Sequence, residues 1–193
     1  MHEIRLAGRG GQGIVTAGEL LGRAAVFEGR HAQAIPTFGP ERRGALSSCT
    51  LRISEEPIML KYSATSPDVV LVLDATIWHM ANVFLGLRPG GTLLFNTSDA
   101  PAVIDEALRS GTYGYTPPAD DYTLYTVDAT AIALDHIKRP ITNTALMGAL
   151  TGATSLLKMS SVEAVIEERF GNKAAANIES ARAAAAGLKK LRN

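Results

Sequence analysis

The apolar residues of this chain recur with two different periods, and the change of period divides the chain into strands and helices. Residues 69–73 are apolar at every position, which is typical of a central strand covered on both faces. Residues 92–96 form a second, mostly apolar strand after a turn signal of one proline and two glycines at 89–91. From residue 14 to residue 25, apolar positions follow the spacing of an amphipathic helix. Strand and helix patterns therefore alternate.

The remaining segments extend this alternation to the whole chain. We expect further strands at 4–7, 31–36, 45–54 and 122–127. Residues 57–60 are expected to pair with 45–54 in a hairpin. Helices are expected at 77–87, 99–110, 129–137, 142–157, 161–170 and 173–191. The pattern predicts one α/β domain over residues 1–193, a three-layer α/β/α sandwich with a mostly parallel, mixed sheet.

Composition and charge narrow the class of protein. The 193 residues are 46% hydrophobic and 20% charged, as in an ordinary globular protein. The 19 basic side chains equal the 19 acidic ones, so no net field favours nucleic acid or an anionic membrane as a partner. The longest apolar runs, 69–73 and 91–95, are far shorter than the roughly 20 residues that span a bilayer. The N-terminus lacks the pattern of a secretory signal, which favours the cytoplasm.

Cysteine and histidine give no sign of a metal or redox centre. Cys49 is the single cysteine, so the chain forms no internal disulfide and has too few thiols for an iron–sulfur cluster. His79 and His136 have no second histidine at the spacing of a metal site. We therefore expect no metal ligands in this chain.

A glycine-rich turn at residues 8–13, GRGGQG, is the first candidate for chemistry. Gly8, Gly10 and Gly13 have the spacing Gly-x-Gly-x-x-Gly between a strand and a helix, which is the context of a dinucleotide-binding fingerprint. Glycines let a ligand approach the backbone, and the N–H groups of a helix N-terminus attract anions. A tight turn without a ligand would use the same glycines, so both interpretations stay open.

The acid that should complete a dinucleotide site is missing. An acidic residue after the second strand normally binds the ribose, yet residues 30–34 read RHAQA and the nearest acid, Glu28, precedes the strand. A second segment, FGPERRG at 38–44, places Arg42 and Arg43 in a loop bounded by glycines. A charged loop of this kind is usually only solvated, so its meaning depends on the first motif.

The two motifs together resemble the gamma subunit or gamma domain of 2-oxoacid:ferredoxin oxidoreductases of the pyruvate, 2-oxoglutarate, 2-ketoisovalerate or indolepyruvate type. That family joins a Gly-x-Gly-Gly-Gln-Gly turn to a Gly-x-Glu-x-Arg-Gly loop, and residues 8–13 and 39–44 match them. It also has Pro-Asp before a buried strand and asparagine at the start of a late helix, which correspond to Pro67-Asp68 and Asn143. The resemblance extends from residue 8 to residue 148.

The resemblance implies a subunit that has no catalytic residue of its own. Enzymes of this family oxidatively decarboxylate a 2-oxoacid to an acyl-coenzyme A, with thiamine diphosphate, Mg²⁺ and iron–sulfur clusters, and pass electrons to ferredoxin. The resemblance places these cofactors in alpha, beta and ferredoxin-like delta subunits, with coenzyme A shared by this chain. The sequence agrees, since it has no cysteine cluster and no Gly-Asp-Gly of a thiamine-magnesium signature.

The resemblance also indicates binding residues. It implies that amides of the glycine turn face the coenzyme A pyrophosphate and that the two arginines pair with phosphates. Docking of the thiamine-binding subunit is the competing role for both loops. Independently of the resemblance, Asp74 follows the central strand and is expected at the edge of the sheet where polar groups often line sites, but it is not counted among the binding residues. The candidates for coenzyme A or subunit contacts are Gly8, Gly10, Gly11, Gln12, Gly13, Arg42, Arg43 and Asn143.

A function of another class remains as the alternative. The chain would then be a free-standing Rossmann-like domain that binds NAD(P) or FAD through Gly8, Gly10 and Gly13. The two functions differ in whether the isolated chain binds a dinucleotide.

Overall fold

A computed structural model describes residues 1–38, 44–59, 62, 65–112 and 114–191. Its strands are β1 (His2–Arg9), β2 (His31–Phe38), β3 (Leu46–Ser54), β4 (Val69–Val72), β5 (Gly91–Asn96), β6 (Tyr122–Val127) and β7 (Lys189–Lys190). Its helices are α1 (Ile14–Phe27), α2 (Pro101–Arg109), α3 (Ala129–His136), α4 (Asn143–Thr154), α5 (Met159–Phe170) and α6 (Ala174–Ala186), with short 3-10 helices η1 (Ala75–His79) and η2 (Gly171–Lys173).

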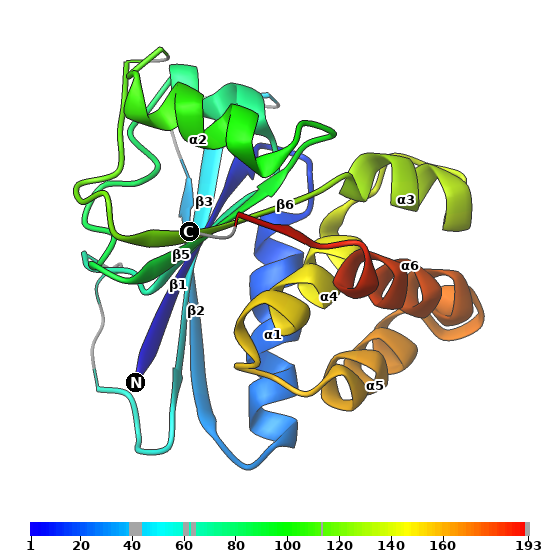
Figure 1. Cartoon of the computed structure of the whole chain (residues 1–193). Helices are drawn as coiled ribbons and strands as arrows, with labels where there is room; N and C mark the ends of the chain where they lie inside the picture. The colour runs from blue at the N-terminus through cyan, green and yellow to red at the C-terminus, as the bar shows by residue number, and fades with distance from the viewer. Residues whose placement is uncertain (39–43, 60–61, 63–64, 113, 192–193) are drawn as a thin grey trace.

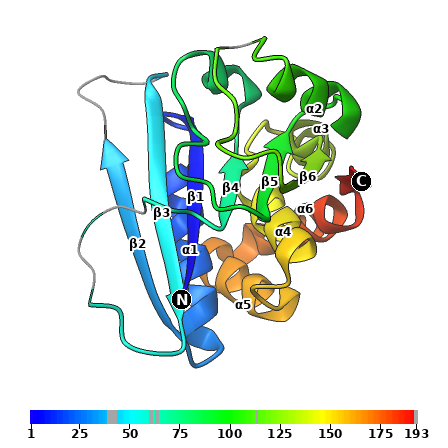
Figure 2. The same cartoon turned by 60° about the vertical axis from the view of Figure 1, so that its left-hand side comes forward.

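The strands form one mixed sheet in the order β2-β3-β1-β4-β5-β6-β7. Strands β1, β4, β5 and β6 are parallel neighbours in its middle, whereas β3 runs antiparallel to β1 and β2, and β7 antiparallel to β6. Figure 2 shows β2 at one edge of this sheet, followed by β3, β1 and β4. The predicted mixed sheet with a parallel centre is confirmed.

Helices cover both faces of the sheet. On one face α1 packs against β2 and β3, and α4, α5 and α6 pack beside it. The helix α2 lies on the other face and contacts β6 (Figure 1). This arrangement agrees with the predicted three-layer sandwich.

Successive residues of the central strands point to opposite faces and build two cores. Val69 and Leu71 of β4 belong to the core under α1, whereas Val70 and Val72 belong to the core on the α2 side. Because both faces of β4 are buried, its sequence is apolar at every position. On the α2 side, Trp78 and Phe95 pack edge to face with ring centroids 5.1 Å apart.

The predicted hairpin between residues 45–54 and 57–60 is wrong. Strand β3 already has β1 on one side and β2 on the other, so residues 57–59 form no strand. Its pairing partner on this side is β2, with Ala34 opposite Leu51, and Leu51 is buried in the core under α1. Strand β2 also continues through Pro36 to Phe38, because proline is tolerated in an edge strand.

Two predicted helices also differ from the structure. Residues 77–87 form no α-helix, because η1 ends at His79 and turns follow. The φ of 76° at Gly86 is incompatible with a helix, and its backbone packs directly on the carbonyl of Thr65. The last helix was expected to reach residue 191, but α6 ends at Ala186 and β7 then adds to the sheet edge at β6.

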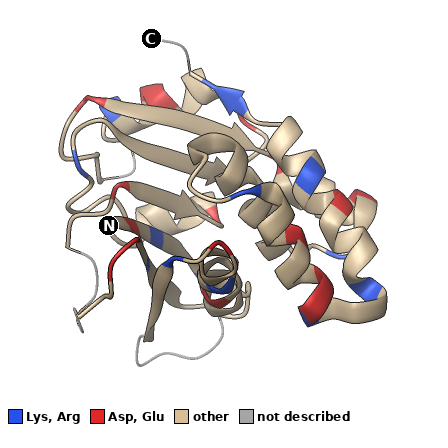
Figure 3. Cartoon of the chain, turned by 90° about the horizontal axis from the view of Figure 1, so that it is seen from below, with Lys and Arg blue, Asp and Glu red and all other residues tan. Residues whose placement is uncertain are grey.

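Basic and acidic residues are interspersed over the helices and strands, as Figure 3 shows. On the helical layer Arg182 donates to Glu163 at 2.7 Å, and Arg23 pairs with Glu168. Local pairing of this kind leaves little long-range field. Among the described residues, no helix combines the length and the apolar character that crossing a bilayer requires.

Candidate functional site

The glycine turn follows β1, the strand at which the order of strand addition reverses from one side of the sheet to the other. From β1 the chain passes through α1 to β2 on one side, whereas β4, β5 and β6 lie on the other side of β1. Strands β1 and β4 are parallel, so Arg9 and Asp74, which follow their buried parts, lie at the same edge. In open α/β sheets the crevice at such a switch point is the usual ligand site. The fold therefore places the turn at this crevice.

The backbone of the turn is open on one side and enclosed on the other. Gly11 and Gly13 have positive φ angles of 98° and 77°, which favour glycine. A Cβ atom at Gly11 would meet no heavy atom within 4 Å. A Cβ atom at Gly8 would lie 2.7 Å from the Oε1 of Gln12 and 3.0 Å from the Cβ of Leu73. Gly8 thus lets the turn close, and Gly11 leaves its backbone accessible.

The side chain of Gln12 points into the protein. Its Oε1 accepts a hydrogen bond from the backbone N–H of Arg9 at 2.7 Å. Its Nε2 donates to the Oδ2 of Asp74 at 3.1 Å. Both polar atoms of this amide are therefore occupied within the subunit, so the turn presents backbone groups rather than the Gln12 side chain.

Arg9 and Asp74 connect the turn to its surroundings. The Arg9 guanidinium donates to Asp74 Oδ2 at 3.1 Å, to Thr76 Oγ1 at 2.8 Å and to the carbonyl of Gly44 at 3.1 Å. The N–H and the hydroxyl of Thr76 donate to Asp74 Oδ1 at 2.9 and 2.6 Å. The ends of two strands and Gly44, two residues before β3, are thereby linked through one carboxylate and one guanidinium.

The carboxyl group of Asp74 stays ionised. Partial burial on its own would raise its pKa, but hydrogen bonds from Thr76 and Gln12 and the charge of Arg9 outweigh burial. The pKa of Asp74 therefore lies below its ordinary value.

Stability is expected to fall at acid pH partly because of Asp74. A carboxyl whose pKa is lowered in the folded state adds stability above its unfolded pKa, about 3.9, and loses it as the pH falls through the folded pKa. The midpoint of thermal unfolding should therefore fall more steeply below about pH 4 for the unsubstituted chain than for Asp74→Asn. Melts followed by circular dichroism measure this, and equal slopes would contradict it.

Two helix N-termini meet at the turn. Gly13 is the residue before α1, and Asn143 is the first residue of α4. A Cβ atom at Gly13 would lie 2.8 Å from the Nδ2 of Asn143, so these two residues are in direct contact. The Oδ1 of Asn143 accepts the N–H of Thr144 at 2.9 Å, which leaves its Nδ2 beside the turn. Neither helix has an acidic residue in its first turn or a side-chain cap.

The structure brings most of the predicted site residues together. Gly8, Gly10, Gly11, Gln12 and Gly13 form the turn, and Asn143 contacts it, as described above. Arg42 and Arg43 lie outside the described residues. The end of their loop is nevertheless held at the turn, because Gly10 donates to the carbonyl of Ala45 at 2.8 Å and Gly44 donates to the carbonyl of Gly10 at 3.3 Å.

Sequence reasoning missed two members of this site. Arg9 occupies a variable position of the glycine motif, and Thr76 follows the central strand in a segment that was predicted to lead into a helix. One feature of the sequence could have indicated this pair. Arg9 and Asp74 have opposite charges, and each stands at the end of a predicted strand, just before the chain turns.

Cys49 takes no part in the site. It is fully buried under α1, where its Sγ occupies the space beside Gly18. Burial raises the pKa of its thiol to about 11, so the group is protonated at neutral pH. Reactivity of this cysteine is correspondingly low.

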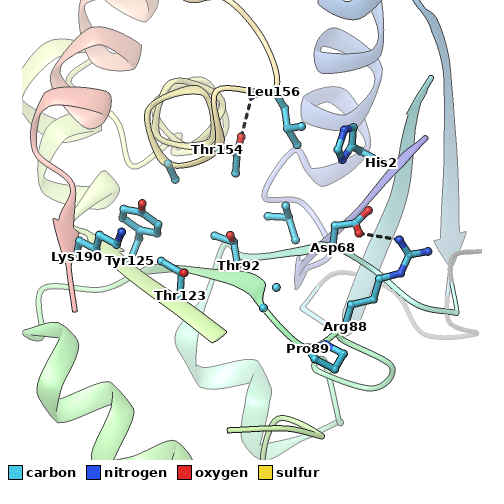
Figure 4. Close-up of a pocket in the computed structure, with 14 residues that line it drawn as sticks. His2, Asp68, Arg88, Pro89, Thr92, Thr123, Tyr125, Thr154, Leu156 and Lys190 are labelled. Atoms are coloured by element: carbon cyan, nitrogen blue, oxygen red, sulfur yellow. Dashed lines mark hydrogen bonds and ion pairs between the residues drawn. The ribbon is translucent and has the colours of Figure 1, made fainter. Parts of the chain in front are cut away.

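A cavity of about 400 Å³ lies at the other ends of the parallel strands, near the amino ends of β4, β5 and β6 (Figure 4). Thr92, Tyr125 and Lys190 line one part of it. On the other part Arg88 donates to the Oδ1 of Asp68 at 2.8 Å, so the charges compensate each other. Of the predicted binding residues that the structure describes, none lines this cavity.

Fold and site together define a class of protein. It is a three-layer α/β protein with a strand, glycine turn and helix at its switch point, in which an antiparallel strand lies next to β1. The sequence matches the family described as pyruvate ferredoxin/flavodoxin oxidoreductase over residues 3–187. The chain therefore belongs to the pyruvate ferredoxin/flavodoxin oxidoreductase family.

Individual relatives agree with this assignment. The chain is 42% identical over 185 residues to pyruvate synthase subunit PorC of Methanothermobacter marburgensis. The aligned region covers 95% of this chain and 96% of the relative. It is 44% identical over 170 residues to the common subunit gamma of pyruvate/ketoisovalerate oxidoreductases of Pyrococcus abyssi, with 88% and 87% covered. The crystal structure of pyruvate oxidoreductase subunit PORC from Thermotoga maritima is 32% identical and has a TM-score of 0.82, with 99% and 98% covered.

These comparisons confirm the predicted family and role. The chain is a gamma-type subunit of an oxidoreductase complex, and the complex includes other subunits.

Proposed function

We propose that the glycine turn binds the pyrophosphate of coenzyme A in the assembled oxidoreductase. The observation that carries this proposal is the contact between Gly13 and Asn143, where the N-termini of α1 and α4 meet. Helix N-termini carry partial positive charge and free N–H groups, which suit a phosphate. The open backbone at Gly11 and the Nδ2 of Asn143 add accessible surface and a further donor.

The two arginines of the neighbouring loop extend this site in the proposal. Guanidinium groups bind phosphate oxygens in a bidentate manner. The hydrogen bonds of Gly10 with Gly44 and Ala45, which hold the residues after this loop at the turn, support this part of the proposal.

The reaction and partners follow from the family. We propose oxidative decarboxylation of a 2-oxoacid to an acyl-coenzyme A, with ferredoxin as the acceptor. Thiamine diphosphate with Mg²⁺ would supply the decarboxylation chemistry, and iron–sulfur clusters the electron path, from alpha, beta and ferredoxin-like delta subunits. The present chain would act as one domain that binds coenzyme A and contacts these subunits. A cytoplasmic location is part of the proposal, in keeping with a single, free cysteine.

A dinucleotide-binding domain fits the structure less well. In that fold the strand next to β1 is parallel to it and ends in the acid that binds the ribose. Here the neighbour of β1 on this side is the antiparallel β3, and β2 ends one strand further away at Phe38. The adenosine half of NAD or FAD therefore lacks its usual partner.

Coenzyme A kinetics of the reconstituted complex test the proposal. We expect Arg42→Ala and Arg43→Ala each to raise the Michaelis constant for coenzyme A about 10-fold, because each removes a charge-assisted hydrogen bond. Arg169→Ala, on the exposed surface of α5, is the matched control and should leave this constant unchanged. Unchanged constants in all three variants, with normal assembly, would refute the phosphate contact.

The rival functions give different results in two further measurements. Loss of co-purification in Arg42→Ala or Arg43→Ala would favour a docking role for the loop. Calorimetric titration of the isolated chain with NAD, NADP and FAD should show no micromolar binding, whereas micromolar binding would support the free-standing domain.

A further inference from the structure

We propose that Asp74 is the positioning residue of the glycine turn. It would act by holding the side chains of Arg9 and Gln12 inward, so that only the backbone of the turn faces a ligand. This inference rests on the proposed function for its effect on coenzyme A, but not for its effect on the geometry of the turn.

The first observation is that Asp74 supplies acceptors to both sides of the turn. Its Oδ2 accepts from Gln12 Nε2 and from Arg9 Nε, both at 3.1 Å, and its Oδ1 accepts from Thr76. One carboxylate therefore accepts hydrogen bonds from β1, from the turn and from the 3-10 helix η1 that follows it. A carboxylate with this many donors is held in one orientation.

The second observation is that the Gln12 amide is committed in one orientation. Its Oε1 must face the N–H of Arg9 and its Nε2 must face Asp74, because each neighbour offers only the complementary group. A Cβ atom at Gly8 would lie 2.7 Å from this Oε1, so the motif leaves room for the folded-back amide only with glycine there. The glycine at 8 and the glutamine at 12 thus form one unit with Asp74.

The third observation concerns the neighbouring loop. Arg9, held by Asp74 and Thr76, also donates to the carbonyl of Gly44 at 3.1 Å. Through Arg9, Asp74 therefore adds to the backbone hydrogen bonds of Gly10 that hold the end of the arginine loop at the turn. This arrangement accounts for why two motifs so far apart in the sequence act as one site.

A reciprocal exchange of the two side chains tests the inference. Gln12→Glu places a second carboxylate at hydrogen-bond distance from Asp74 and removes the donated hydrogen bond. In the double variant Gln12→Glu/Asp74→Asn, the amide at position 74 donates to the carboxylate at position 12, which restores this bond with reversed polarity, whereas Arg9 Nε loses Oδ2 as its acceptor. If each substitution only damaged the local structure, their effects would add in the double variant. If the contact between positions 12 and 74 is what matters, the double variant should be less affected than Gln12→Glu.

The readouts are hydrogen–deuterium exchange of residues 8–14 and coenzyme A kinetics, both in the assembled complex. We expect Gln12→Glu to speed exchange of the Gly10 and Gln12 amides about 10-fold and to raise the Michaelis constant for coenzyme A by a similar factor. The rate constant at saturating coenzyme A should change less than about twofold. The double variant should recover part of both changes, because the bond between positions 12 and 74 returns while the acceptor of Arg9 Nε does not.

Thr76→Val is the milder variant for the case in which Gln12→Glu does not assemble. Thr76 is exposed, so its replacement leaves the fold intact while it removes hydrogen bonds to Arg9 and Asp74. Thr76→Val should change amide exchange and the Michaelis constant for coenzyme A in the same direction as Gln12→Glu, by about one third as much.

The outcomes are distinct. Rescue of both readouts supports the positioning role and the proposed function together. In a second outcome, hydrogen–deuterium exchange speeds up in Gln12→Glu and slows again in the double variant, while coenzyme A kinetics do not change. This result supports the positioning role and refutes the coenzyme A function. Exchange that does not respond to Gln12→Glu or Thr76→Val, or that is no slower in the double variant than in Gln12→Glu, overturns the inference.

Discussion

Replacing Glu3 with alanine is expected to lower the midpoint of thermal unfolding by roughly 6–20 °C. The reason is the buried guanidinium of Arg52, which has 0% exposure and donates to Glu3 Oε1 at 2.7 Å. Without Glu3 its remaining contacts are Gln33 Oε1 at 3.2 Å and the ring of Tyr62 at 5.2 Å. Removing one partner of a buried ion pair leaves an uncompensated charge, which costs about 3–5 kcal/mol.

Two comparisons make the Glu3 experiment specific. Glu163→Ala breaks the pair with Arg182, a side chain that is 52% exposed, and should cost less than about 1 kcal/mol. The double variant Glu3→Leu/Arg52→Met removes both charges and should cost clearly less than Glu3→Ala, because no charge remains buried. Scanning calorimetry of the three variants measures the order. A Glu3→Ala midpoint close to that of Glu163→Ala would contradict the expectation.

Replacing Gly148 with alanine is expected to destabilise the fold by about 3 kcal/mol. Gly148 lies where α4 crosses α6, and a Cβ atom there would overlap the carbonyl oxygen of Ala181 and lie 2.6 Å from its Cα. Backbone atoms cannot rotate away as a side chain can, so the two helices must separate. The separation loosens the core below the helical layer, which includes Leu146 and Ala184.

Gly22→Ala is the matched control, because Gly22 is also a buried helical glycine. A Cβ atom at Gly22 would lie 3.5 Å from Leu51 and 3.6 Å from Ala32, which are ordinary contacts. Alanine should therefore stabilise α1 by about 0.5–1 kcal/mol through its better helix propensity. Urea denaturation of both variants measures the two free energies of unfolding. The same sign of change for both would refute the packing argument.

Much of the fold could be predicted because burial is periodic along the chain. Residues 69–73 and 92–96 could be predicted as central strands, because strands covered on both faces have mostly apolar sequences. The helix at 14–25 was recognised because one face alone is buried. The errors came from segments without such a period, where packing decides. Residues 77–87 contain Trp78 and Phe84, which pack into the core from the short 3-10 helix η1 and from a turn rather than from one α-helix.

The candidate site could be predicted in part. The glycine turn and Asn143 were named from the sequence, and they are in contact in the structure. The position of the Gln12 side chain could not be predicted, since a glutamine in a loop is normally solvated. Its inward orientation depends on Asp74, which lies 62 residues further along the chain.

By itself, the sequence determined the layered α/β fold, the position of the turn and the family. Hydrophobic periodicity and the conformations open to glycine are local properties, so they can be read along the chain. Only the tertiary structure decided that β3 lies between β1 and β2, and that Arg9 and Gln12 converge on Asp74. Strand pairing and the direction of a polar side chain depend on partners distant in sequence, and neither leaves a local pattern.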